Sequence, residues 1–111
     1  MRVLVVDDEA LIVLLTASWL EELGCEVETA LNGTEALAKL NDGDPSVEVL
    51  ITDVNMPGMS GYELAKRATA VRPGLQVVLL SGAEDKQQQG LPLIRKPFFQ
   101  ADLRRIIKTL R

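Results

Sequence analysis

The stretch Glu48–Gly61, EVLITDVNMPGMSG, decides the fold that this chain is expected to adopt. Its aliphatic and β-branched run Val49–Thr52 is typical of a strand buried on both faces of a parallel sheet. The run ends at Asp53, and a loop rich in Pro and Gly follows. Ligands of open α/β sheets collect at the carboxyl ends of such strands. Asp53 is therefore predicted to lie where the chemistry of the protein takes place.

Length and composition narrow the classes of function. We expect residues 1–111 to form one domain with an aliphatic core. The net charge of −4 argues against direct binding of nucleic acid, which needs clustered Lys and Arg. The chain has no histidine, which excludes Ser-His-Asp and Cys-His catalysis and the common zinc sites. It shows no signal peptide and no apolar run of the roughly 18 residues that span a bilayer, so we expect a cytoplasmic protein without a membrane partner.

Apolar runs alternate with helical patterns along the whole chain, which predicts βαβ units and a parallel sheet. The expected strands are residues 2–6, 25–30, 49–52, 76–80 and 91–94, and the expected helices are residues 10–23, 34–40, 61–71 and 100–110. Ser60 is the expected N-cap of its helix. The first helix is apolar on more than one side, which fits either deep burial or an interaction face.

Five polar residues follow or end these strands: Asp7, Asp8, Asp53, Ser81 and Lys96. Right-handed crossovers bring the carboxyl ends of parallel strands to one edge, so these side chains should share a pocket. Three adjacent carboxylates repel one another and raise one another's pKa values unless a cation lies among them. Magnesium, which prefers oxygen ligands and keeps several waters, is the best match. Carboxylates, magnesium, a lysine and a hydroxyl together indicate phosphoryl transfer.

Four motifs carry a resemblance to a known family: VLVVDDE (3–9), ITDVNMPGMSG (51–61), LLSG (79–82) and RKPF (95–98). In this order they resemble the receiver domain of two-component response regulators, and the likeness covers essentially the whole chain. The resemblance implies a flavodoxin-like (βα)5 fold, a doubly wound parallel five-stranded sheet with strand order 2-1-3-4-5.

The resemblance also implies a role for each site residue. Asp53 would be the nucleophile that accepts a phosphoryl group from the phosphohistidine of a sensor histidine kinase or a histidine phosphotransfer protein. Asp8 and Asp53 would bind Mg²⁺ directly, Asp7 would act through a water, and Asn55 would offer its backbone carbonyl. Slow self-catalysed hydrolysis of the aspartyl phosphate would follow, so it stays open whether the protein should be classed as an enzyme.

Two further residues complete the implied site. Ser81 would donate a hydrogen bond to the phosphoryl oxygens and report phosphorylation to the surface. Lys96 would pair with Asp53 or its phosphate, and the Lys96–Pro97 peptide bond would be cis.

The sequence departs from the family pattern at two places. Only 14 residues separate Ser81 from Lys96, so the fourth helix is expected to be short or missing. Leu93 stands where the family often has an aromatic residue. We therefore expect the first and last helices, the latter with Arg104 and Arg105, to form the face for a partner or a homodimer. The chain fits a single-domain regulator or the receiver of a hybrid kinase.

Several alternatives stay open at this point. The same fold serves as a phosphorylation-independent protein–protein interaction module. A phosphatase of the haloacid dehalogenase class also uses an Asp nucleophile and Mg²⁺, but it needs an Asp-x-Asp pair, and residues 53–55 lack the second acid. Asp7 also fits a helix cap, and Ser81 a plain turn residue. Met56 and Met59 are interpreted as packing and loop residues rather than ligands.

Overall fold

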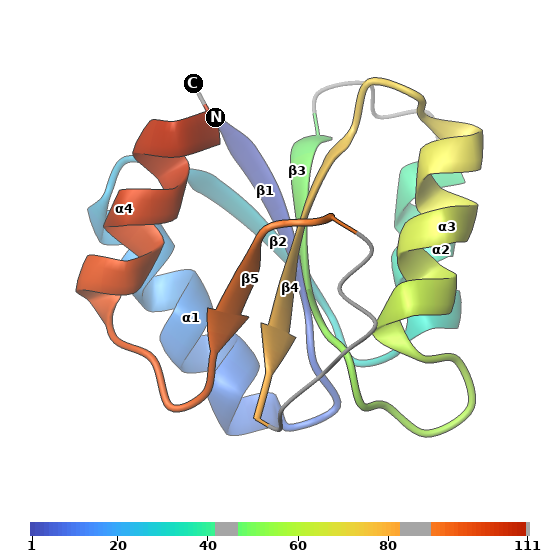
Figure 1. The fold of residues 1–111 in the computed structure, drawn as a ribbon, viewed down its shortest axis with the longest axis horizontal. Helices are drawn as coiled ribbons and strands as arrows, with labels where there is room; N and C mark the ends of the chain where they lie inside the picture. The colour runs from blue at the N-terminus through green and yellow to red at the C-terminus, as the bar shows by residue number, and fades with distance from the viewer. Residues whose placement is uncertain (42–46, 83–89, 111) are drawn as a thin grey trace.

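A parallel five-stranded sheet runs through the molecule in the order β2-β1-β3-β4-β5 (Figure 1), as expected. The computed structural model of the protein describes residues 1–41, 47–82 and 90–110. The strands are β1 (Arg2–Val6), β2 (Glu26–Ala30), β3 (Val47–Asp53), β4 (Gln76–Ser81) and β5 (Leu93–Arg95). The helices are α1 (Ala10–Glu22), α2 (Gly33–Asn41), α3 (Gly61–Val71) and α4 (Gln100–Leu110).

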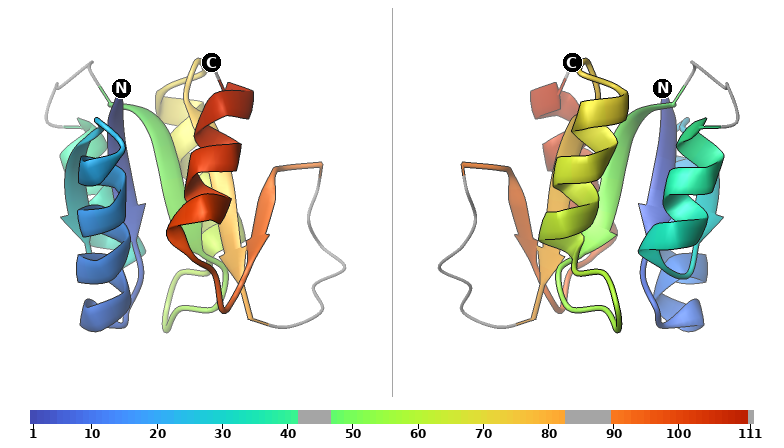
Figure 2. Two further views of the ribbon diagram at one scale, coloured as in Figure 1. Left: turned by 90° about the vertical axis from the view of Figure 1, so that its left-hand side faces the viewer. Right: turned by 90° about the vertical axis from the view of Figure 1, so that its right-hand side faces the viewer.

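The four helices cover both faces of the sheet, with α1 and α4 on one side and α2 and α3 on the other (Figures 1 and 2). Because successive residues of a strand point to opposite faces, the apolar runs of β1, β3 and β4 feed two separate cores. Val5, Ile51 and Leu80 pack toward α1 and α4, whereas Leu50 and Leu79 pack toward α2 and α3. This arrangement confirms the prediction of strands buried on both faces.

Most expected elements differ from the observed ones by no more than two residues at either end. The fifth strand was expected at residues 91–94, but β5 spans Leu93–Arg95. Pro92 has no N–H to donate to a ladder, and only its carbonyl contributes, by accepting a 2.9 Å hydrogen bond from the N–H of Leu79. The stretch in which a short fourth helix was expected, residues 83–90, lies outside the described residues except for Gly90.

Helix α1 exposes part of its apolar surface. Its buried residues are Val13, Thr16 and Leu20, whereas the side chains of Leu11 and Leu14 are 80% and 64% exposed. Of the two alternatives for this helix, an interaction face therefore fits better than deep burial alone. No helix in the described part of the chain combines the length and apolar character needed to cross a membrane.

The start of α3 is pressed against the end of β3. Ser60 caps the helix as expected, since its hydroxyl accepts a 3.1 Å hydrogen bond from the N–H of Glu63. The next residue, Gly61, donates a 2.8 Å hydrogen bond to the carbonyl of Val54. A Cβ atom on Gly61 would lie 2.2 Å from the carbonyl oxygen of Asp53. Only glycine fits this position, because the obstructing atoms belong to the backbone.

We expect Gly61→Ala to lower the free energy of unfolding by about 1–3 kcal/mol or more, as overpacking against rigid neighbours does. Urea unfolding measures the loss. The matched control is Gly74→Ala, because a Cβ on Gly74 meets nothing within 4 Å and its φ is not positive. That control should change stability by no more than about 0.5 kcal/mol. Equal losses in the two variants would contradict the packing argument.

Candidate active site

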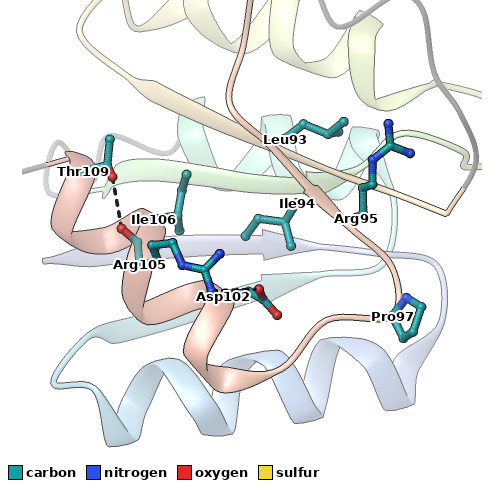
Figure 3. Close-up of a pocket in the computed structure, with 8 residues that line it drawn as sticks. All are labelled: Leu93, Ile94, Arg95, Pro97, Asp102, Arg105, Ile106 and Thr109. Atoms are coloured by element: carbon teal, nitrogen blue, oxygen red, sulfur yellow. Dashed lines mark hydrogen bonds and ion pairs between the residues drawn. The ribbon is translucent and has the colours of Figure 1, made fainter.

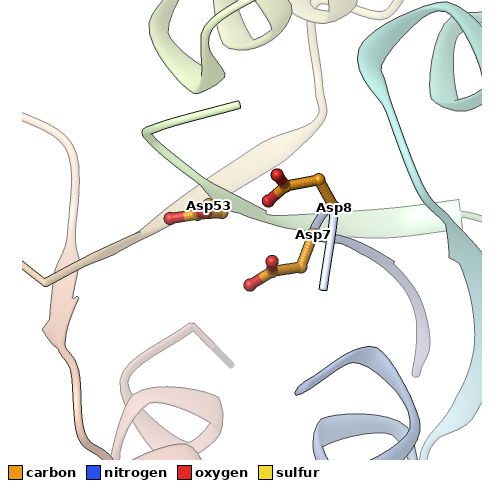
Figure 4. Close-up of side chains that lie close together, drawn as sticks. All are labelled: Asp7, Asp8 and Asp53. Carbon is orange, nitrogen blue, oxygen red and sulfur yellow. The ribbon is translucent and has the colours of Figure 1, made fainter. Parts of the chain in front are cut away.

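The five polar residues at the strand ends lie at the same edge of the sheet, as the topology predicts. Asp7 and Asp8 follow β1, Asp53 is the last residue of β3, Ser81 is the last residue of β4, and Lys96 follows β5. One carboxylate oxygen from each of Asp7, Asp8 and Asp53 lies within 4.8 Å of the other two. Figure 4 shows the three side chains gathered at the carboxyl end of the sheet. Three segments far apart in the sequence thus build one acidic cluster.

Lys96 bridges two of the acids. Its Nζ atom lies 2.9 Å from Oδ2 of Asp7 and 3.4 Å from Oδ1 of Asp53. Its backbone N–H donates a 2.8 Å hydrogen bond to the carbonyl of Ser81, which fixes the chain beyond β5 beside β4. The Lys96–Pro97 peptide bond is cis, as the resemblance implies. The neighbouring Arg95 is exposed, so Lys96 is the basic residue that faces the acids.

Burial and charge act together on the ionisable groups. Burial raises the pKa of Asp53, and the negative charge of Asp7 raises it further. Lys96 and a hydrogen bond from the backbone of Asn55 oppose this rise in pKa without cancelling it. Burial would lower the pKa of Lys96, but its hydrogen bond to Asp7 and the charges of Asp53 and Asp7 outweigh burial, so that pKa is raised. The lysine therefore stays protonated, while Asp53 still lacks sufficient positive charge nearby.

The residues present fit a bound Mg²⁺ ion. Three carboxylates and one ammonium leave two formal negative charges in the cluster, which one divalent cation would balance. One carboxylate oxygen of each acid lies within 4.8 Å of the other two, so small side-chain adjustments would let all three reach one ion. Asp7 and Asp53 are buried, whereas Asp8 is exposed and opens the cluster to solvent. Mg²⁺ keeps several waters, so one open side suits it. Asn55 is exposed on the loop after β3.

Two contacts of the site were not predicted from the sequence. Oδ1 of Asp7 accepts a 2.9 Å hydrogen bond from the N–H of Glu9, which fixes this carboxylate in a turn. Glu9, rather than Asp7, holds the N-cap position of α1. The buried hydroxyl of Thr52 donates a 3.0 Å hydrogen bond to the carbonyl of Asp53. A threonine within an otherwise aliphatic strand was the available signal for this second contact.

Comparisons with known proteins agree with this geometry. The family model of the response regulator receiver domain matches residues 3–108. Protein PilG of Pseudomonas aeruginosa is 32% identical over 98% of this chain and 86% of its own length. Hybrid signal transduction histidine kinase L of Dictyostelium discoideum is 31% identical over 96% of this chain, but over only 7% of its own length. The chain likewise spans 23% of a protein-glutamate methylesterase/protein-glutamine glutaminase of Caulobacter vibrioides. It thus covers a minor part of several curated relatives.

Solved structures match over nearly the whole chain. The chemotaxis protein CheY4 of Vibrio cholerae superposes with a TM-score of 0.89 at 30% identity, covering 99% of this chain and 98% of that one. The response regulator TrrA of Thermotoga maritima, solved in complex with Mg(2+)-BeF, gives a TM-score of 0.87 at 34% identity with the same coverage. The strand order, the acidic cluster with its lysine, and these matches show that the chain belongs to the response regulator receiver domain family of two-component signal transduction.

Proposed function

We propose that Asp53 accepts a phosphoryl group from the phosphohistidine of a sensor histidine kinase or a histidine phosphotransfer protein, in a Mg²⁺-dependent reaction. The observation that supports this most strongly is the place of the Asp53 carboxylate, within 4.8 Å of the other two acids of the cluster and 3.4 Å from the ammonium of Lys96. The alternative of a phosphorylation-independent interaction module is not favoured, because such a module needs neither the acids nor the lysine.

The transfer forms one bond and breaks one bond. A carboxylate oxygen of Asp53 attacks the phosphorus, the phosphorus–nitrogen bond breaks, and the imidazole leaves with its electron pair and takes up a proton. Lys96 then pairs with a phosphoryl oxygen, and the hydroxyl of Ser81 donates to another. Asp8, Asp53, Asp7 through a water, and the carbonyl of Asn55 would hold Mg²⁺. A bound Mg²⁺ would neutralise negative charge on the transferred group. In phosphoryl transfer, positioning and charge neutralisation supply most of the catalysis.

The burial of the nucleophile bears on the lifetime of the product. The side chain of Asp53 is only 7% exposed, so few directions remain for a water to approach an acyl phosphate formed on it. Hydrolysis by the domain itself is therefore expected to be slow. The protein acts as an acceptor that stores the phosphoryl group rather than as an enzyme with fast turnover.

A cytoplasmic location of the protein stays a prediction.

The partner is expected to bind across α1 and α4. On α1, Leu11 and Leu14 are exposed, and a hollow of about 350 Å³ lies between this helix and Pro97-Phe98, with Lys96 in its wall. An apolar surface that borders the site suits a protein that must bring its phosphohistidine to Asp53.

Charge distribution distinguishes the α4 side of this face. Residues 95–111 hold six of the twelve Lys and Arg but only one of the sixteen acids. A groove of about 440 Å³ lies between β5 and α4, with Arg95, Asp102 and Arg105 in its walls (Figure 3). A symmetric dimer through α4 would bring two sets of like charges together. An acidic partner protein is therefore favoured over a homodimer at this face.

Incubation with acetyl phosphate and Mg²⁺ should add one phosphoryl mass to the wild-type chain, measured by intact-protein mass spectrometry. Asp53→Ala should gain none, because it lacks the nucleophile. EDTA should also abolish labelling of the wild type, and added Mg²⁺ should restore it. Wild type that gains no phosphoryl mass under these conditions would overturn the proposed function.

Lys96→Met should slow labelling by acetyl phosphate by about 100-fold, since it removes the preorganised ammonium that would stabilise the transferred group. Mg²⁺ binding, measured by calorimetry, should persist because the three carboxylates remain. Lys66→Met is the matched control, as Lys66 is exposed on α3 away from the cluster. Labelling at the wild-type rate in Lys96→Met would contradict the role of this lysine.

Charge reversal at Arg104 and Arg105, both to Glu, should weaken transfer from a phosphorylated protein donor by about tenfold or more, in a salt-dependent manner. Both residues are exposed on α4. Labelling by acetyl phosphate should stay unchanged, because a small donor needs no docking face. The matched control is the reversal of Lys66 and Arg67, which are exposed on α3. Unaltered transfer from the protein donor would count against this face.

A further inference from the structure

The β3–α3 loop (residues 54–60) joins Asp53 to α3 and contains Asn55, whose backbone carbonyl is the proposed neutral ligand of Mg²⁺. Asn55 is exposed, so packing of its own side chain does not hold it in place. A side-chain ligand can change rotamer to reach an ion, but a backbone carbonyl moves only with its loop. The affinity for Mg²⁺ therefore depends on what holds the loop.

The base of the loop is held by backbone hydrogen bonds. The N–H of Val54 donates to the carbonyl of Leu80 at 2.9 Å, and the N–H of Gly61 donates to the carbonyl of Val54 at 2.8 Å. The tip is different, because Pro57 and Gly58 are exposed and Gly58 has a φ of 81°. Two side chains of the loop reach the body of the domain: Met56, which is buried in the core beside Asn55, and Met59 beyond the tip.

Met59 provides the contact on the α3 side of the tip. It is partly buried and packs against the core beneath α2 and α3. A Cβ atom built on Gly33, the first residue of α2, would lie 2.6 Å from Sδ of Met59, and 3.1 and 3.2 Å from its Cβ and Cγ. The thioether thus occupies the space beside the Cα atom of Gly33, where any other residue type would displace it.

We infer that Met59 is a positioning residue, which holds the β3–α3 loop against α2 through its contact with Gly33 and so fixes the carbonyl of Asn55 toward Mg²⁺. The inference rests on the proposed function, in which the acidic cluster binds Mg²⁺. It assigns Gly33 a matching role, because the absence of a side chain there makes room for Met59. The contact crosses from one βα unit to another, so it connects the loop to a part of the domain that does not carry Asp53.

The test compares Mg²⁺ affinity, measured by calorimetry, with the free energy of unfolding in urea for each variant of the full chain. Met59→Ala should weaken Mg²⁺ binding by about tenfold, as loss of a residue that orients a ligand does. Met59→Leu, which conserves volume, should bind Mg²⁺ within about twofold of wild type. Gly33→Ala should also weaken binding, because its methyl group pushes the thioether away.

The double variant Gly33→Ala/Met59→Ala separates this inference from general packing. Once Met59 is truncated, the methyl group at position 33 has space, so the double variant should bind Mg²⁺ no more weakly than Met59→Ala alone. Leu75→Ala serves as the control for stability. Leu75 is buried and directly precedes β4, at the opposite end of the sheet from the site. This control should lower the free energy of unfolding and leave Mg²⁺ affinity unchanged.

The outcomes distinguish the inference from the function on which it rests. If wild type binds Mg²⁺ and Met59→Ala binds it equally well, Met59 has no positioning role. Effects of Met59→Ala and Gly33→Ala that multiply in the double variant would also overturn the inference. If Met59→Ala fails to fold, Gly33→Ala replaces it in the test, and wild-type Mg²⁺ affinity in Gly33→Ala would overturn the inference. A wild-type chain that binds no Mg²⁺ would overturn the proposed function and the inference together.

Discussion

The repulsion among three neighbouring carboxylates is the constraint on which the rest of the structure depends. Parallel strands end at one edge, and this edge brings Asp7, Asp8 and Asp53 within 4.8 Å of one another. Lys96 relieves part of the repulsion through its contacts with two of the acids, yet the pKa of Asp53 remains raised. The fold therefore holds a site that is short of positive charge, which a bound divalent cation would supply.

Topology explains why so much of this site could be predicted from the sequence. Two premises were enough to predict that Asp53 and Lys96 meet at one edge of the sheet. Their strands are parallel, and both residues lie at the carboxyl ends of those strands. The contact of Met59 with Gly33 could not be derived in this way, because it depends on how a loop folds back over the start of a distant helix. The predicted start of β5 was wrong because the apolar run includes Pro92. Proline has no N–H for the sheet ladder, and a pattern of apolar residues does not reveal this.

The surface around the site is divided by chemistry. Helix α1 presents exposed leucines, and α4 presents basic side chains on a chain whose net charge is negative. The sequence of α1 allowed either burial or an interaction face, since apolar content alone does not tell which side of a helix meets the sheet. The observed exposure of Leu11 and Leu14 shows that this side of α1 does not pack on the sheet. The proposed docking face and the acidic cluster thus lie on adjacent parts of the molecule.

The close approach of Gly61 to the carbonyl of Asp53 has a mechanical consequence. With backbone lying directly on backbone, no side chain intervenes that could change rotamer and absorb a displacement. A shift of the Asp53 peptide is therefore expected to carry the first turn of α3 with it, whereas a flexible side chain at this contact could absorb the same shift by changing rotamer. The glycine acts as a rigid joint, and it makes α3 the helix that follows the main chain of Asp53 most directly.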